Sequence, residues 1–146
     1  MTYTPIVEGA MIATEFRAVG GSVQNSAVVW DSTTKRSTAT TSVSVDGSGN
    51  ITLPQDGSYW LIANIDITRP SAVTSLKFEW FRGGVALTTE KGASLAVLSS
   101  GTSTSNLLAQ MVVEAVDEQV VQLKETSGNT QTINSNMSLL ILEVSR

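Results

Sequence analysis

The stretch DGSYWLIANIDI, residues 56–67, decides the fold, because it begins with an Asp-Gly turn signal and continues as an alternating strand. One face of this strand carries only apolar side chains: Tyr59, Leu61, Ala63, Ile65 and Ile67. We predict that this face belongs to the core. The opposite face begins with Trp60 and Ile62 before it becomes polar at Asn64 and Asp66. The outer face of a surface strand is usually polar, so part of this second face is expected to be covered as well.

Two further runs are apolar on both faces. The last run, MSLLILEVS, alternates Leu139 and Ile141 with Leu140 and Leu142, and the run LLAQMVV at 107–113 shows the same excess. A contiguous apolar patch on one sheet would be an association site, and a second copy of the chain is its simplest cover. Burial within the chain, as in a small barrel, is the alternative. Periodicity leaves both explanations open.

The rest of the chain has the pattern of an all-β protein, since short alternating runs are separated by clusters of Gly, Ser, Asn and Asp and no run keeps a helical period. Strands are expected at residues 10–19, 22–30, 42–46, 50–53, 58–67, 75–82, 85–89, 94–98, 106–114, 119–125 and 137–145. In the run SLKFEWFR, Phe78 and Trp80 share the core face with Leu76. Polar loops are expected at 99–105 and 126–135. About ten short strands in a chain of this length predict a sandwich, jelly roll or barrel.

Composition excludes several classes of function. The chain has 146 residues, which suit one domain, and 41% of them are hydrophobic. Its net charge of −4 argues against nucleic-acid binding, which needs a basic surface. No apolar stretch is long enough to span a membrane, and the N-terminus lacks the pattern of a signal peptide. With no cysteine and no histidine, the chain has no disulfide and no histidine base or metal ligand.

The remaining polar residues do not form a catalytic or metal-binding pattern. No serine lies in a G-x-S-x-G turn, and the cluster DGSGN at 46–50 is a hairpin turn rather than a phosphate cradle. The adjacent carboxylates Asp117 and Glu118 point apart on a strand or turn. We therefore expect no enzyme activity, no metal and no cofactor. Among the tryptophans, Trp30 is the one expected to be exposed and able to stack on a sugar.

The order of these signals resembles the tumour necrosis factor-like superfamily, which includes the globular heads of complement-type and collagen-associated proteins. Five segments carry the likeness: AVVWDSTTK (27–35), NITLPQDGSYWLIANIDI (50–67), LKFEWFRGGV (76–85), NLLAQMVVEAVDEQVVQL (106–123) and MSLLILEVS (137–145). The turn at 116–118 departs from the family, because it lacks the usual glycine. The resemblance implies an antiparallel jelly-roll sandwich of about ten strands that assembles into a compact trimer, with the inner sheet lining the threefold axis.

The resemblance also implies roles for particular residues. Residues 10–146 would form the single jelly-roll domain, preceded by an N-terminal arm at 1–9. The trimer interface would contain Trp60, Ile62, Asn64, Leu108, Leu140 and Leu142. The core would contain Tyr59, Leu61, Ile65, Phe78, Trp80, Leu139 and Ile141.

For function, we expect a non-catalytic virion structural protein: a homotrimeric decoration or cement protein that binds the major capsid protein of a tailed bacteriophage. The chain begins at its own Met without a secretion signal, lacks cysteine and is rich in Ser and Thr. It would be assembled in the host cytoplasm and located in the virion. The alternative is a receptor-binding or carbohydrate-binding trimeric head of a phage tail fibre or a bacterial surface structure.

Overall fold

A computed structural model describes residues 12–37, 43–68, 76–87, 96–98, 103–116 and 118–145. Within these residues every helix-or-strand element is a β-strand, and every strand pair is antiparallel, which confirms the all-β prediction. The strands are β1 (Ala13–Ala18), β2 (Gly21–Val23), β3 (Trp30–Ser37), β4 (Ser44–Val45), β5 (Ile51–Leu53), β6 (Gly57–Thr68), β7 (Leu76–Arg82), β8 (Val85–Ala86), β9 (Ala96–Leu98), β10 (Ser103–Ala115), β11 (Gln119–Glu125), β12 (Gln131–Ile133) and β13 (Ser138–Ser145). The expected arm at 1–9 lies outside the described residues.

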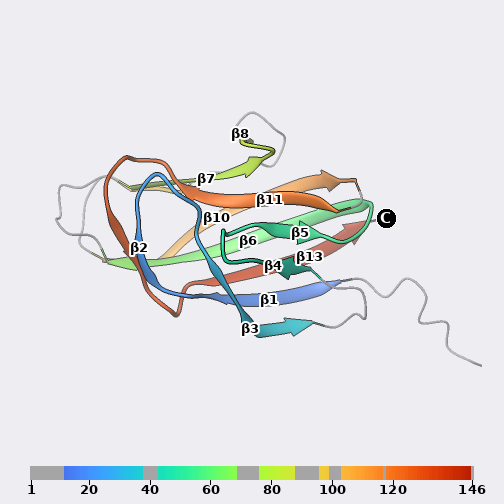
Figure 1. Ribbon diagram of the computed structural model, residues 1–146, viewed down its shortest axis with the longest axis horizontal. Helices are drawn as coiled ribbons and strands as arrows, with labels where there is room; N and C mark the ends of the chain where they lie inside the picture. The colour runs from blue at the N-terminus through green and yellow to red at the C-terminus, as the bar shows by residue number, and fades with distance from the viewer. Residues whose placement is uncertain are drawn as a thin grey trace, which may run out of the picture.

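The strands form two sheets whose longer members run along the long axis of the molecule (Figure 1). The first has the order β2-β12-β6-β13-β1-β3, with β10 also paired to β6; we call it the β6 sheet. The second has the order β4-β5-β11-β7-β8, with β9 also paired to β7; we call it the β11 sheet. Strands distant in sequence are neighbours in both sheets, so the fold is held together mainly by non-local pairing.

Strand β6 organises its sheet, because it pairs with β10, β12 and β13. Leu61 lies opposite Met111 of β10 and Ile141 of β13. Antiparallel registers place such partners on the same face, so the apolar positions of three strands meet in a continuous row. All three side chains are fully buried.

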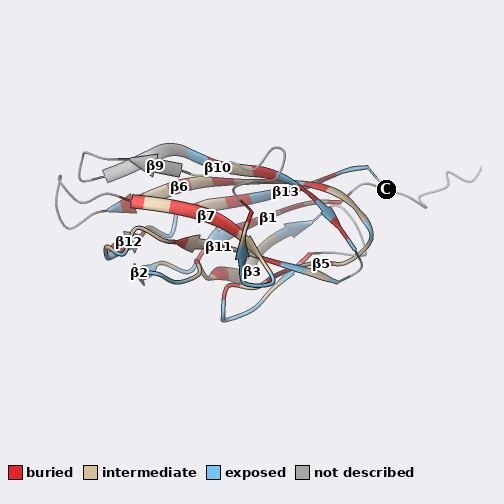
Figure 2. Ribbon diagram, turned by 90° about the horizontal axis from the view of Figure 1, so that it is seen from above, coloured by how far each residue is buried: buried red, intermediate tan, exposed pale blue. Residues whose placement is uncertain are grey.

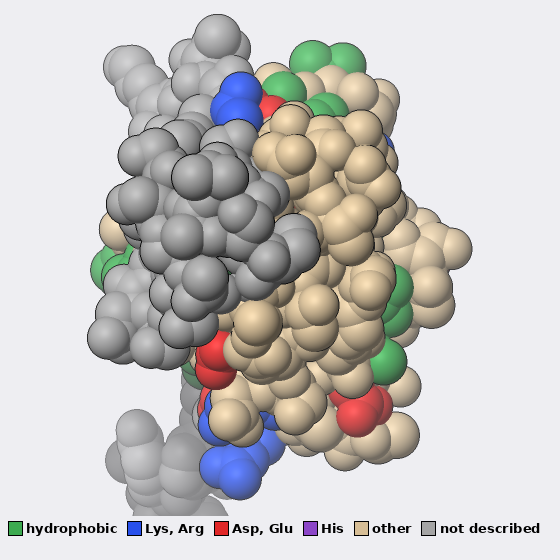
Figure 3. Space-filling view, turned by 90° about the vertical axis from the view of Figure 1, so that its left-hand side faces the viewer, with side chains coloured by type: hydrophobic (Ala, Val, Ile, Leu, Met, Phe, Trp, Pro, Cys, Tyr) green, Lys and Arg blue, Asp and Glu red, His purple; other side chains and the backbone are tan. Residues whose placement is uncertain are grey.

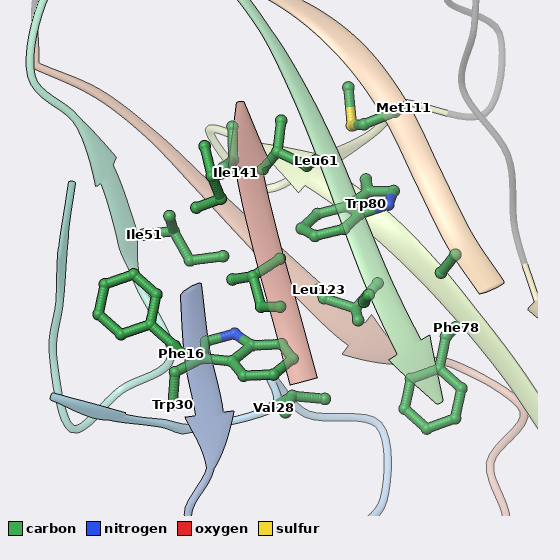
Figure 4. Packing of buried hydrophobic residues seen from close by; sticks show 14 of the residues in the cluster. Phe16, Val28, Trp30, Ile51, Leu61, Phe78, Trp80, Met111, Leu123 and Ile141 are labelled. Carbon is green, nitrogen blue, oxygen red and sulfur yellow. The ribbon is translucent and has the colours of Figure 1, made fainter. Parts of the chain in front are cut away.

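The core lies between the two sheets. Figure 4 shows Phe16, Leu61 and Ile141 from the β6 sheet with Trp80 and Leu123 from the β11 sheet around one packed interior. The expected core residues are each at most 1% exposed: Tyr59, Leu61, Ile65, Phe78, Trp80, Leu139 and Ile141. Buried and more exposed positions alternate along most long strands, whereas β7 is buried over most of its length (Figure 2).

Trp30 corrects one expectation, because it is only 2% exposed and packs in the core instead of presenting its ring to solvent. The preceding segment docks on β11: the Val28 amide donates to the Leu123 carbonyl at 2.8 Å, and Ala27 forms an isolated bridge with Lys124. This docking brings Val28 and Trp30 into the core together.

Several strand assignments from the sequence were also wrong. The expected strand 22–30 is interrupted, since only its first two residues and Trp30 lie in strands and Asn25 has a φ of 47°. The following strand, β3, has the polar sequence WDSTTKRS and a largely exposed pattern, so it lacks an alternating signal. Strand β12 lies inside the expected loop 126–135, where three residues pair with β2 and β6. Short or exposed edge strands are fixed by such partners rather than by their own periodicity.

The tight turns agree more closely with what the sequence predicts. Gly83 and Gly84 have φ values of 57° and 80°, as a two-residue hairpin between β7 and β8 requires. In the β4–β5 turn, Asp46 Oδ1 accepts bonds from the amides of Ser48 and Asn50 at 2.8 and 3.0 Å. Asp46 Oδ2 accepts a third bond from Asn50 Nδ2 at 2.8 Å. These bonds, that of the Asn50 side chain above all, lower the pKa of Asp46 below its usual range.

Candidate subunit interface

The face of the β6 sheet directed away from the core carries a cluster that we call the apolar patch. It consists of Trp60, Ile62, Leu108, Val112, Leu140 and Leu142. Four of these side chains are substantially exposed: Trp60 by 38%, Leu108 by 46%, Val112 by 40% and Leu140 by 36%. Isolated exposed apolar residues are common on monomers, but a contiguous group across neighbouring strands marks an association surface.

Strand register brings the patch together from three distant segments. Trp60 lies between Val112 of β10 and Leu142 of β13, so one row across the sheet is apolar. In the next row, Ile62 lies between Gln110 and Leu140. The patch is therefore a product of tertiary pairing.

The third row completes the patch and contains its polar residues. Asn64 lies between Leu108 of β10 and Ser138 of β13. All six residues expected at an interface thus lie on one face of one sheet: Trp60, Ile62, Asn64, Leu108, Leu140 and Leu142. Sequence reasoning missed Val112 and Gln110, although the alternation of β10 places both on the face that carries Leu108.

The polar part of the indole in this patch is satisfied inside the chain. Trp60 Nε1 donates to Gln110 Oε1 at 3.2 Å across β6 and β10. A buried indole N–H without a partner is costly, because its bond to water is lost and not replaced. With this bond in place, the exposed part of Trp60 can be covered by apolar surface without leaving an unpaired donor.

Charged side chains border the patch on the β1–β3 side. Glu15 lies opposite Leu140 and forms an ion pair with Arg17 at 3.6 Å. Arg17 in turn lies opposite Asp31 of β3. The pKa of Asp31 is lowered, chiefly by a hydrogen bond from the Thr33 hydroxyl and also by one from the Thr33 amide. An apolar centre with a charged margin is the usual arrangement of a protein–protein interface.

Other surfaces differ from the patch. At the end of the molecule seen in Figure 3, uncharged polar side chains and backbone cover most of the described surface, and charged side chains occur in small separate groups. In the described residues no group of three or more acidic, histidine or cysteine side chains could hold a metal ion. The same part of the chain contains no helix that is long and apolar enough to cross a membrane.

Comparison with known proteins gives a fold but no sequence relative. No protein-family model and no curated protein sequence matches the chain. Among solved structures, Eiger TNF from S. frugiperda superposes with a TM-score of 0.64 at 13% identity, over 92% of each chain. Murine APRIL superposes with a TM-score of 0.66 at 10% identity, over 92% of this chain and 99% of the other. The chain has a tumour necrosis factor-like jelly-roll fold.

GITRL from bushbaby is a third neighbour of this TNF-like chain, with a TM-score of 0.55 and 11% identity over 93% of this chain and 96% of that one. Identities this low establish the fold alone.

At the turn where the sequence lacks the usual glycine, Glu118 adopts a φ of 57°, and Gln119 N donates to the Val116 carbonyl at 2.9 Å. A left-handed φ is unusual for a residue with a side chain, so this turn is strained.

Proposed function

We propose that this TNF-like domain is a non-catalytic structural protein that works as a homotrimer, with the apolar patch as its subunit contact. The observation that carries the proposal is the patch itself, which spans β10, β6 and β13 and has its indole N–H already paired. Burying apolar area stabilises an assembly by roughly 25 cal/mol per Å². The six neighbouring side chains of the patch would form the apolar centre of the contact, and the charged β1–β3 margin would limit its extent.

Three copies are proposed because the fold resembles a family in which the inner sheet lines a threefold axis. A ring of this kind uses heterologous contacts, in which one surface of a subunit meets a different surface of the next, and a rotation of one third of a turn closes the ring. The β11 sheet would then form the outside of the trimer.

The oligomeric state tests this proposal. We expect light scattering and sedimentation to give three times the chain mass of 15.4 kDa at micromolar concentration. The melting temperature should rise with protein concentration, because association stabilises only the folded form. A monomer of chain mass under these conditions would contradict the proposal.

For the location of the trimer, we propose the capsid of a tailed bacteriophage, where it would bind the major capsid protein as a decoration protein. A small β-rich domain without cysteine or histidine and rich in Ser and Thr supports this placement. The test is co-sedimentation of purified protein with capsids that lack their decoration protein. Removing residues 2–8 should abolish capsid binding while the trimer persists. Equal capsid occupancy by the shortened chain would contradict a role for the arm.

A further inference from the structure

The β11 sheet carries a hollow of about 300 Å³ on the face directed away from the core. It lies between the β7–β8 hairpin, the start of β11 and the end of the β4–β5 turn. Its lining consists of Asn50, Phe81, Gly83, Gly84, Glu118, Gln119, Val120 and Gln122. This volume is at the lower end of small-molecule sites, which span about 300–1,000 Å³. We propose that the hollow binds a neutral, hydroxyl-rich ligand, namely a saccharide.

The hydrogen-bonding groups of the hollow are held in position. Gln122 Nε2 donates to Asn50 Oδ1 at 2.8 Å and to the Ser48 carbonyl at 3.3 Å. Asn50 is held in turn by Asp46, through the bonds that close the β4–β5 turn. Both amide hydrogens of Gln122 are thus used within the chain, and its Oε1 keeps its capacity to accept a bond from a ligand hydroxyl. A preorganised acceptor loses little entropy on binding.

The apolar part of the lining suits the C–H face of a sugar ring. Phe81 supplies an aromatic ring, and Lys124 Nζ lies 4.7 Å from the centroid of that ring. This cation–π contact restrains Phe81. Val120, which is 37% exposed, adds a second apolar surface. One ring and one valine are too little for a purely apolar ligand, and they match a molecule that presents C–H groups on one side and hydroxyls around its edge.

The charges near the hollow are mixed. Glu118 lines the hollow, and the Lys124 ammonium lies over the ring of the lining residue Phe81, so charges of both signs are present. At the rim, a Cβ added to Gly83 or Gly84 would meet nothing within 4 Å, so a ligand can approach the backbone there. Amide side chains and backbone groups can both donate bonds to neutral hydroxyls and accept bonds from them, and the mixed charges give no strong preference for an anion.

The proposal is independent of the trimer, because the hollow and the apolar patch lie on different sheets. In a trimer that contacts through the β6 sheet, the three hollows would face outward and bind multivalent glycans with gain in avidity. A monomer would still bind a single saccharide, so failure of one proposal does not imply failure of the other.

The test is a titration of isotope-labelled full-length protein with glucose, galactose, mannose, fucose and N-acetylglucosamine, followed by the backbone amide signals. At least one sugar should move the signals of Gly83, Gly84, Gln119 and Gln122. Phe81→Leu keeps an apolar side chain but removes the aromatic face, and it should weaken binding about tenfold. Gln122→Met removes the acceptor and should weaken binding as well. Thr132→Ala, an exposed change on the β6 sheet, is the matched control and should bind as the parent does.

Several outcomes would overturn the proposal. One is the absence of amide shifts with every sugar. Another is a set of shifts at Trp60 and Gln110, which would place the ligand on the apolar patch. Larger shifts of the hollow with sialic acid than with any neutral sugar would contradict the assignment of a neutral ligand. Unchanged binding by folded Phe81→Leu and Gln122→Met would show that these side chains do not form the site.

Discussion

The two sheets have similar inner faces and very different outer faces. On the β6 sheet, the outer face presents Trp60 and Leu140 partly exposed. On the β11 sheet, the outward side chains include Lys77 and Glu79, joined by an ion pair at 3.2 Å, as well as those that line the hollow; the Thr126 hydroxyl donates to Glu79 at 2.6 Å. Inner faces must be apolar in any sandwich, so they define the fold. Outer faces need not be apolar, so the difference between them is the reason for which we propose that a partner covers the β6 sheet.

The largest expected effect is on folding stability, and it comes from a change on the inner, core-facing side of the β6 sheet. Tyr59 is fully buried, and its hydroxyl donates to the Gln55 carbonyl at 3.0 Å. Tyr59→Ala removes the ring and leaves a cavity, so we expect a loss of roughly 3–5 kcal/mol of folding free energy. Chemical denaturation with far-ultraviolet circular dichroism would measure it. A loss below about 1 kcal/mol would show that the core closes around the missing ring.

The next effect tests the outer face of the β6 sheet. Trp60→Asp or Leu140→Asp places one charge per subunit in the proposed contact, and burying an unpaired charge costs several kcal/mol. We expect the trimer to dissociate, with more β-structure retained than in Tyr59→Ala. Retention will be incomplete if the free subunit is itself unstable.

The matched control for these variants is Thr52→Asp, which places the same charge on the outer face of the β11 sheet. It should remain a trimer by sedimentation. If Trp60→Asp also remains a stable trimer, the apolar patch is not the subunit contact, and the contrast between the outer faces has another cause.

These contrasts were visible in the sequence only where a strand alternates over its whole length. Strand β6 does so, and its sequence predicted both the buried face with Tyr59 and the apolar second face with Trp60. Three residues are too few to show a period, so β12 could not be distinguished from a loop. Trp30 was misplaced for a related reason, because its burial depends on the docking of residues 26–28 on β11.

The candidate site was predictable to a similar degree. Periodicity separated the residues of each strand into two faces, but it could not show that Trp60 lies beside Val112 and Leu142, since strand order and register come from pairing across the chain. The hollow on the β11 sheet was not predictable at all. Its lining comes from the β4–β5 turn, the β7–β8 hairpin and β11, and each contributes ordinary turn or strand residues.

A smaller effect concerns the side-chain hydrogen bond between Trp60 and Gln110 in the apolar patch. Gln110→Ala removes the acceptor of Trp60 Nε1 and should weaken the trimer by about 1–3 kcal/mol, because the indole N–H becomes unpaired when the contact forms. Trp60→Phe removes the donor and replaces the indole with a smaller ring. In the double variant, the loss should therefore be smaller than the sum of the two single losses. Additive losses, measured by the concentration dependence of dissociation, would show that the bond does not act in the assembled state.

The smallest effect compares two exposed carboxylates, one beside each sheet face. The pKa values of Asp31 and Asp46 are both lowered from the ordinary value of 3.8. A depressed pKa means that the carboxylate form is favoured by folding, so its contribution is present above pH 3.8 and is lost as the pH falls through the folded-state value. Both residues are solvent-exposed, so each contribution should be small.

Asparagine variants separate the two carboxylates because their bonds differ. Asp31 accepts both Thr33 bonds through Oδ1 alone, which an asparagine oxygen can also do. Asp46 uses both oxygens, and Asp46→Asn would place an amide NH₂ against Asn50 Nδ2, two donors facing each other. At pH 7, Asp46→Asn should therefore lower the melting temperature more than Asp31→Asn does. That excess should shrink as the pH falls below 3.8, because protonation of the parent removes the same acceptor. An excess of constant size across the whole pH range would show that the loss comes from the altered turn backbone and not from the Asp46 carboxylate.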